Sequence, residues 1–332
     1  MNMSKNEAHG PRILVYGPQG AGKSTLLRYL INTTLNKCDD VYYLDTDPGQ
    51  TEFSPPGVVS LTKVTGPLLG PSFSHLRTPY RMIFTGSINV ASPPMHQKSV
   101  ETLMQLFNVK FPQKTLFFNS ENCSSFVKNI LPNGVSHIQI PARKKNKAPF
   151  YTSKELRNFA LLAYFGQCQK NFMPLTFMNA FPPVCVCWDN IAIYVMDKKV
   201  PPHRLIEAVH CSVVALCYVH QAFMLDSEQP ELPRTLFDEP LNECIGFGLV
   251  RAADEVKHLL YIITPLSIQQ LKKVNAIIKG NIMLPDDVFL KQPITNVPLP
   301  FTDQSEKIMR PSRQPVKELT IPTPNQSFYK LH

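Results

Sequence analysis

The sequence has 332 residues, of which 43% are hydrophobic, so it can bury a substantial core. Its net charge of +9 is not concentrated in one Lys/Arg block, which suits a protein that meets a polyanion over a broad surface, although a merely basic protein fits the charge equally well. The eight cysteines form no CxxC pair and no apolar stretch approaches about 18 residues, so we expect no zinc knuckle, disulfide scaffold, secretion signal or membrane span.

The first predicted elements are a strand, a glycine-rich loop and a helix. Residues 12–16 (RILVY) form a compact apolar run that predicts a buried strand, and helical spacing runs from Lys23 to Leu35. Between them, residues 17–24 (GPQGAGKS) match G-x-x-x-x-G-K-S without gaps. A preceding strand and a following helix are the context in which this motif binds nucleotide phosphates; the alternative is a chance glycine-rich turn.

The loop predicts a site for a nucleoside triphosphate. Its glycines let successive N–H groups turn toward phosphate oxygens at a helix N-terminus, where the helix dipole favours anions. We expect Lys23 to neutralise charge on the β- and γ-phosphates and the Ser24 hydroxyl to take one Mg²⁺ position. The predicted nucleotide-binding residues are Gly17, Pro18, Gln19, Gly20, Ala21, Gly22, Lys23, Ser24 and Thr25.

A second apolar run, residues 41–45 (VYYLD), predicts a strand that ends in two carboxylates. Asp45 and Asp47 lie at its carboxyl end, the edge of an open α/β sheet where ligands collect. We expect Asp45, Asp47 and Ser24 to form the metal site, with one carboxylate organising Mg²⁺ and the other accepting a proton from an attacking hydroxyl. The alternative is a simple Asp-Pro-Gly turn that Asp47 caps.

Further apolar runs at residues 81–84, 115–118 and 136–140 alternate with helical stretches. This alternation predicts an α/β fold with a parallel sheet covered by helices. The pattern breaks at residues 142–153, a loop that contains Arg143, Lys144, Lys145 and Lys147, and helical spacing resumes over residues 154–169.

Beyond about Pro174 the pattern changes to short β-type runs at residues 191–195, 245–250 and 259–264, with turn residues between them. The only helix expected there covers residues 202–215. From residue 292 the chain is Pro-rich and polar. We therefore predict a polar lead (1–11), a P-loop domain (12–173), a smaller β-rich C-terminal domain (174–291) and a Pro-rich tail (292–332).

Two features argue against a GTPase. Residues 36–39 (NKCD) fit the guanine-reading pattern N-K-x-D, but they follow the helix that starts at Lys23, roughly 20 Å from the phosphates. We expect them to form the C-terminal turn of that helix. The D-x-x-G pattern also fails, because the third residue after Asp47 is Gln50.

Residues 17–32 (GPQGAGKSTLLRYLIN) and 43–61 (YLDTDPGQTEFSPPGVVSL) resemble the polynucleotide 5′-hydroxyl-kinase family, in particular its nucleolar branch. Residues 158–165 (NFALLAYF), 244–248 (CIGFG) and 264–280 are also similar to that branch. The resemblance therefore covers most of the chain from residue 12 to about residue 292.

The resemblance implies a RecA-like P-loop kinase domain, ATP with Mg²⁺, and phosphorylation of a single-stranded RNA 5′ end. It further implies a nuclear protein of the nucleolus that acts in pre-ribosomal RNA processing, in a complex with a ribosomal-RNA endonuclease. Lys23 and Ser24 keep their roles, Asp47 matches the general base of a D-x-x-Q motif, and Gln50 is its companion.

Arg157 resembles a lid arginine that would stabilise charge on the migrating phosphoryl group; the alternative is a solvated arginine on a helix surface. The basic side chains of residues 143–147 are either a funnel for the RNA backbone or a solvated loop.

One departure from the family bears on activity. The family places a T-x-G-W clasp after the strand that here covers residues 115–118, whereas this chain continues NSENC at residues 119–123. The single tryptophan, Trp188, lies in the predicted second domain. We therefore expect an active kinase first, and an ATP-binding scaffold in an RNA-processing complex second.

Overall fold

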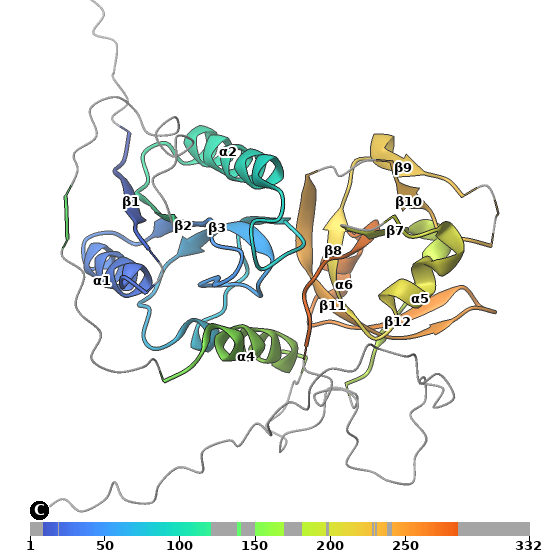
Figure 1. The fold of residues 1–332 in the computed structure, drawn as a ribbon. Coiled ribbons are helices and arrows are strands. Elements are labelled where there is room, and N and C mark those ends of the chain that lie inside the picture. The colour runs from blue at the N-terminus through green and yellow to red at the C-terminus, as the bar shows by residue number, and fades with distance from the viewer. Residues whose placement is uncertain are drawn as a thin grey trace, which may run out of the picture. The chain divides into compact units, whose positions relative to one another are not determined.

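The computed structural model describes residues 9–18, 20–120, 138–140, 150–168, 181–196, 199–227, 229, 231–237 and 241–284. Helices and strands alternate in its first part, and strands dominate after residue 181 (Figure 1). The strands are β1 (Arg12–Tyr16), β2 (Val41–Asp45), β3 (Val58–Val64), β4 (Arg81–Phe84), β5 (Leu116–Ser120), β6 (Val184–Cys187), β7 (Ala192–Val195), β8 (Val213–Tyr218), β9 (Met224–Leu225), β10 (Thr235–Leu236), β11 (Asn242–Asp254), β12 (Leu259–Ile263) and β13 (Ala276–Lys279). The α-helices are α1 (Lys23–Leu35), α2 (Pro93–Lys110), α4 (Ser153–Gly166), α5 (Leu205–Val209) and α6 (Ile268–Leu271), and the 3₁₀ turns are η1 (Ser72–Ser74), η3 (Trp188–Asn190), η4 (Pro202–Arg204) and η5 (Gln221–Phe223).

One mixed sheet runs through the described residues in the order β1-β5-β2-β3-β4-β11-β8-β13-β7. Strands β1, β5 and β2 are parallel neighbours, so their carboxyl ends lie at one edge. Strand β3 pairs antiparallel with β2, β4 pairs antiparallel with β3, and β11 joins β4 antiparallel. The predicted α/β fold with parallel strands is confirmed, although the sheet is mixed: its parallel pairs are β1–β5 and β5–β2 beside the predicted phosphate loop, and β13–β7 at the other end.

The two faces of this first part are buried by different helices. Alternate residues of a strand point to opposite faces. Accordingly Tyr42 and Leu44 of β2 pack in a cluster with α2, whereas Val41 and Tyr43 pack with α1. Helix α2 buries Val100, Leu103, Met104 and Phe107, and helix α1 buries Leu27 and Ile31; both sets follow the spacing of a single helix face. Because both faces are covered, all five residues of β2 are buried.

The second part is built on the long strand β11, which pairs with β4, β8 and β12. Leu161 and Phe165 of α4 pack in one cluster with Phe84 of β4 and Phe247 of β11. The predicted β-rich character of this part is confirmed. All described residues belong to one compact unit, Met1–Thr295, so the predicted boundary at residues 173/174 stays a prediction.

Three sequence predictions need correction or lie outside the described residues. Residues 138–140 form no strand, and Ile138 and Ile140 are 84% and 58% exposed. The helix predicted over residues 202–215 is wrong in its second half, because α5 ends at Val209 and residues 213–215 begin the buried strand β8. These residues pair with β11, which local spacing does not reveal, and two of them, Val213 and Val214, are β-branched. The basic loop residues Arg143, Lys144, Lys145 and Lys147 and the tail after residue 284 are not described.

Within the described ranges, no helix has the length and apolar character needed to cross a membrane. The cysteines of these ranges are all free thiols.

Candidate active site

The predicted phosphate loop joins β1 to α1, as its motif requires. Gly20 and Gly22 have φ angles of 79° and 97°, in the left-handed region that only glycine enters without strain. Gly22 is the N-cap of α1 and has no side chain to bond the first N–H groups of the helix. These groups therefore face the helix N-terminus without a side-chain acceptor, the arrangement that binds phosphate.

The functional side chains of this loop lie at its surface. Lys23 is half-buried, and its Nζ donates to the carbonyl oxygens of Gly17 (2.8 Å) and Pro18 (3.2 Å). Ser24 and Thr25 are exposed in the first turn of α1. Gln19 lies outside the described residues, so its predicted role is untested.

Asp45, the last residue of β2, is fully buried, and its carboxylate accepts hydrogen bonds from the backbone of the loop that follows. Its Oδ2 accepts from the N–H of Glu52 (2.7 Å). Its Oδ1 accepts from Asn119 Nδ2 (3.2 Å) and from the N–H of Asp47 (3.3 Å). Asn119, at the end of β5, also accepts from the N–H of Thr46 (2.9 Å). Two parallel strands are thus joined at their carboxyl ends by buried polar side chains.

Burial raises the pKa of Asp45 to about 8, and the N–H donors of Glu52 and Asp47 offset this effect only in part. Both carboxyl oxygens already accept hydrogen bonds within the protein. A metal ion bound directly by Asp45 would have to replace one of these donors. The role of Asp45 as a metal ligand therefore stays a prediction.

Asp47 lies two residues beyond the end of β2 and is half-buried. Its Oδ1 accepts from the N–H groups of Gly49 (2.9 Å) and Gln50 (3.1 Å), so Asp47 caps this turn, and its predicted catalytic role stays a prediction. No donor among the described residues bonds its Oδ2. A side chain at Gly49 would place its Cβ 2.5 Å from the Ile88 carbonyl oxygen, which explains glycine there. Asp47 therefore has one oxygen fixed by the turn and one available.

Gln50 connects this loop to the start of α4, although 103 residues separate the two in sequence. Its exposed side chain donates from Nε2 to the Ser153 hydroxyl oxygen (2.8 Å). A capping box between Thr152 and Glu155 fixes the first turn of α4. Arg157 follows Ser153 by four residues and therefore shares its helix face. The predicted lid arginine therefore lies on the face of α4 that meets Gln50. It forms no hydrogen bond or ion pair with any described residue.

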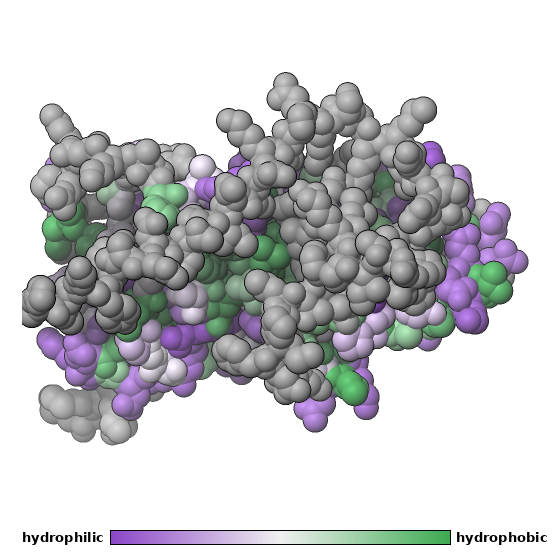
Figure 2. Space-filling model, turned by 90° about the horizontal axis from the view of Figure 1, so that it is seen from below, coloured by the Kyte–Doolittle hydropathy of each residue, from purple (hydrophilic) through white to green (hydrophobic). Residues whose placement is uncertain are grey.

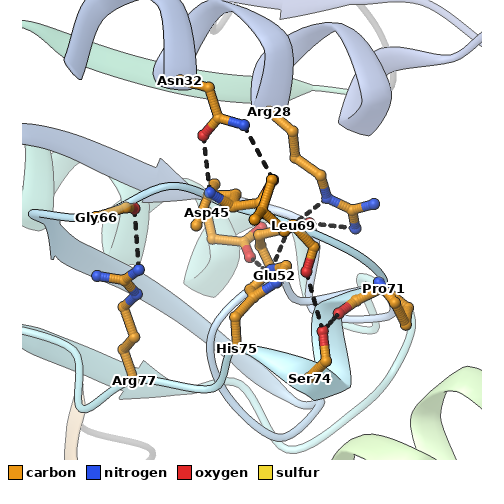
Figure 3. A network of polar contacts seen from close by, with 11 residues as sticks. Arg28, Asn32, Asp45, Glu52, Gly66, Leu69, Pro71, Ser74, His75 and Arg77 are labelled. Carbon is orange, nitrogen blue, oxygen red and sulfur yellow. Dashed lines mark hydrogen bonds and ion pairs between the residues drawn. The ribbon is translucent and has the colours of Figure 1, made fainter. Parts of the chain in front are cut away.

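A buried ionic network fixes the far end of the same loop to the phosphate-loop helix (Figure 3). Arg28 of α1 donates from Nε and Nη2 to the two carboxylate oxygens of Glu52, at 2.6 and 3.0 Å. The His75 Nε2 lies 2.7 Å from Glu52 Oε1. Burial alone would raise the pKa of Glu52, but the bonds from His75 and Arg28 outweigh it and lower the pKa. Since the N–H of Glu52 holds Asp45, this network links α1 to the carboxylates at the sheet edge.

The described residues contain no group of three or more His, Cys, Asp or Glu side chains suited to a metal ion. Mg²⁺ commonly takes one or two carboxylates together with phosphate oxygens. The exposed hydroxyl of Ser24 and the available oxygen of Asp47 are oxygen donors of this kind. Their predicted part in holding Mg²⁺ beside a bound triphosphate stays a prediction.

Two sequence features have no part in this site. Asn36 is the C-cap of α1, which confirms that residues 36–39 form the end of the helix. Trp188 is 2% exposed and stacks on His258 in the second part of the chain, so it does not replace a clasp. Residues 121–137, where the family clasp would follow β5, lie outside the described residues.

Sequence reasoning did not find four residues that build the site: Arg28, Glu52, His75 and Ser153. Their partners come from other segments, and no local motif marks them. Asn119 carried a usable signal, because it is a polar residue directly after an apolar strand predicted to lie beside the phosphate loop.

Two family models match this chain. The P-loop model of mRNA cleavage and polyadenylation factor CLP1 matches residues 17–114. The C-terminal domain model of NOL9-like proteins matches residues 179–285. The first covers the phosphate loop and the elements from α1 to α2, and the second covers the β-rich part.

Curated relatives carry the name polynucleotide 5′-hydroxyl-kinase NOL9. The Danio rerio protein is 30% identical over 90% of this chain and 50% of its own length, and the Homo sapiens protein is 29% identical over 86% and 51%. The Arabidopsis thaliana protein is 27% identical over 82% of this chain and 85% of its own length. The chain spans about half the length of the first two. The resemblance to the polynucleotide 5′-hydroxyl-kinase family is confirmed.

Solved structures support the fold alone. A wild-type Clp1p–Pcf11p complex contains a chain with a TM-score of 0.52 and 14% identity, covering 84% of this chain and 76% of that chain. Another structure, which describes an extended Pcf11p–Clp1p interface and ATP loss in a Gly135Arg mutant, also gives a TM-score of 0.52, at 13% identity.

Proposed function

We propose that this chain, a relative of the polynucleotide 5′-hydroxyl-kinases, transfers the γ-phosphate of ATP to the 5′-hydroxyl of a single-stranded RNA end. One observation carries the proposal: the phosphate loop and the Asp47–Gln50 turn emerge from the carboxyl ends of β1 and β2, on either side of β5. A triphosphate and an acceptor hydroxyl bound at this edge can meet between them. The relatives' name supports this acceptor.

The nucleotide would bind on the α1 side. Gly17–Thr25 present backbone N–H groups to the phosphates, and Lys23 exchanges its loop carbonyls for β- and γ-phosphate oxygens. Ser24 would hold Mg²⁺ directly and Asp47 would reach it through a bound water, which leaves Oδ2 of Asp47 free to accept a proton; the ion would neutralise charge on the phosphates. Asp45 keeps the turn in place from its buried position, whether or not it also reaches the metal.

The acceptor would bind on the other side of Asp47. The turn fixes Oδ1, so Oδ2 is the atom that takes the proton of the 5′-hydroxyl as its oxygen attacks the γ-phosphorus and ADP leaves. Gln50 orients the acceptor together with Ser153. Arg157, on the same face of α4, stabilises the charge of the phosphoryl group in transfer. Most of the rate enhancement comes from positioning and charge neutralisation.

We propose the cellular setting on the relatives' name alone. NOL9-type proteins are named for the nucleolus, which supports pre-ribosomal RNA processing in the nucleus. We propose a complex with a ribosomal-RNA endonuclease as the setting in which 5′-hydroxyl ends arise.

A second function, an ATP-binding scaffold, is favoured by one observation: residues 119–123 (NSENC) lack the T-x-G-W clasp. The clasp helps to hold the RNA end, so its loss bears on the acceptor more than on ATP. This alternative keeps nucleotide binding and removes transfer.

The two functions separate in one assay. The protein is incubated with 5′-hydroxyl RNA and γ-labelled ATP, and ATP affinity is measured in parallel. Label on the RNA, lost in Lys23→Ala, supports the kinase. Tight ATP binding without label, together with a partner protein that is retained only with ATP, supports the scaffold. Competition between ATP and GTP tests the base preference.

A further inference from the structure

We propose that Phe150 and Tyr151 form a stacking platform for a nucleobase of the single-stranded RNA acceptor, beside the proposed transfer site. This inference rests on the proposed function, because it names where that acceptor lies. Phe150 is 82% exposed, although large aromatic side chains are usually buried or packed. Figure 2 views the molecule from the side on which α4 lies in Figure 1, and hydrophobic residues are exposed there among hydrophilic ones.

The platform is rigid because other rings support it. The Phe150 ring contacts the Tyr151 ring edge to face, with centroids 4.7 Å apart and an interplanar angle of 89°. Tyr151 in turn packs against Phe159 of α4 (5.2 Å) and Phe73 of η1 (6.3 Å). Phe73 and Phe159 contact each other at 5.1 Å. The supporting rings are half-buried, so Phe150 is the one that faces solvent and can accept a base.

The platform lies next to residues that the proposed mechanism uses. Phe150 and Tyr151 directly precede the Thr152 N-cap of α4, and the next residue, Ser153, binds the Gln50 side chain at 2.8 Å. A nucleotide whose 5′-hydroxyl reaches Asp47 would pass Gln50. It would therefore pass the start of α4, which this aromatic surface directly precedes in the chain.

The surrounding charges suit a phosphate backbone. Lys154 is exposed, and Arg157 has no partner among the described residues. The one carboxylate between residues 150 and 160, Glu155, accepts from the N–H and hydroxyl of Thr152 (2.7 and 2.8 Å) and is engaged in the cap. Aromatic rings with adjacent cations are the usual surface on which proteins bind single-stranded nucleic acid.

The test measures phosphorylation of short 5′-hydroxyl oligoribonucleotides by wild-type protein and by Phe150→Ala, Phe150→Trp and Phe237→Ala. Phe237 is a matched control, since it is 73% exposed and lies near β10. We expect Phe150→Ala to raise the RNA KM about 5- to 100-fold and to leave the ATP KM within about twofold. Phe150→Trp should keep the wild-type KM, and Phe237→Ala should not change it. An unchanged RNA KM in Phe150→Ala overturns the proposal.

Fluorescence distinguishes failure of the platform from failure of the kinase. Trp188 is 2% exposed, so a tryptophan at position 150 would be the accessible indole. Stacking predicts that single-stranded RNA quenches Phe150→Trp and that duplex RNA of the same sequence does not. Quenching without phosphorylation would reject the kinase and keep the platform. Phosphorylation without quenching, and with an unchanged KM in Phe150→Ala, would reject the platform and keep the kinase.

Discussion

The two sides of the site differ in how they are built. The nucleotide side, residues 17–25, is one continuous stretch from the end of β1 to the first turn of α1, and its geometry comes from glycines and a helix N-terminus. The acceptor side, residues 45–52 with the start of α4, depends on side chains from α1, β5, α4 and the segment before β4. A local backbone motif can bind phosphate almost alone, whereas an acceptor site needs partners from distant segments. Substitutions should therefore affect the two sides in separable ways.

The largest effect is expected for a substitution that removes the proton acceptor of the reaction and leaves the nucleotide side intact. Asp47→Asn keeps the size of the side chain but removes the proton acceptor, so we expect kcat for RNA phosphorylation to fall about 10²- to 10⁴-fold. The ATP Kd should change by less than about threefold. Lys23→Ala, on the nucleotide side, should weaken ATP binding as well as transfer. Equal loss of ATP affinity in both variants would contradict the division into two sides.

The structure explains why the sequence predicted one side better than the other. The strand at residues 12–16, the loop and the helix at residues 23–35 are adjacent in sequence, so spacing alone placed them correctly. The burial of Asp45 was not predictable in this way, because its partner Asn119 is 74 residues away. Similarly, residues 213–215 were assigned to a helix because nothing local shows that β11 pairs with them.

A second expectation concerns the pH dependence of stability on the acceptor side. The pKa of Asp45 is raised from 3.8 to about 8, so the folded chain binds a proton there that the unfolded chain has lost. The free energy of unfolding should therefore fall as pH rises from about 4 to about 8. Measured without nucleotide, this fall should be smaller in Asp45→Asn, by up to about 4 kcal/mol between pH 5 and 8. Parallel curves for the two proteins would show that Asp45 does not titrate in this way.

A third expectation concerns the ionic network that anchors the same side. Glu52→Ala removes a 7% exposed carboxylate and leaves Arg28, 26% exposed, without its partner. We expect the free energy of unfolding, measured with denaturant, to fall by about 2–3 kcal/mol. The control is Glu207→Ala, whose exposed pair with Arg204 should contribute under about 1 kcal/mol. If both substitutions lower the free energy of unfolding by the same amount, the network does not stabilise this side of the site.

The smallest effect is expected for the bridge between the two segments of the acceptor side. The Gln50–Ser153 hydrogen bond is exposed and neutral, so a double-mutant cycle of Gln50→Ala and Ser153→Ala should give a coupling of about 0.5–1.5 kcal/mol in kcat/KM for RNA. The cycle for kcat/KM of ATP should show no coupling. Additive effects on RNA would mean that the two residues act independently.

The central claim is that this edge of the sheet joins a phosphoryl group to an RNA 5′ end, and the position of the transferred label tests it most directly. Wild-type protein is incubated with γ-labelled ATP and matched RNAs that carry either a 5′-hydroxyl or a 5′-phosphate, and the products are digested to mononucleotides. We predict label only on the 5′-terminal nucleotide of the 5′-hydroxyl RNA, and none with Asp47→Asn. Label released as free phosphate with both RNAs, or label that persists at the same rate in Asp47→Asn, would contradict the account.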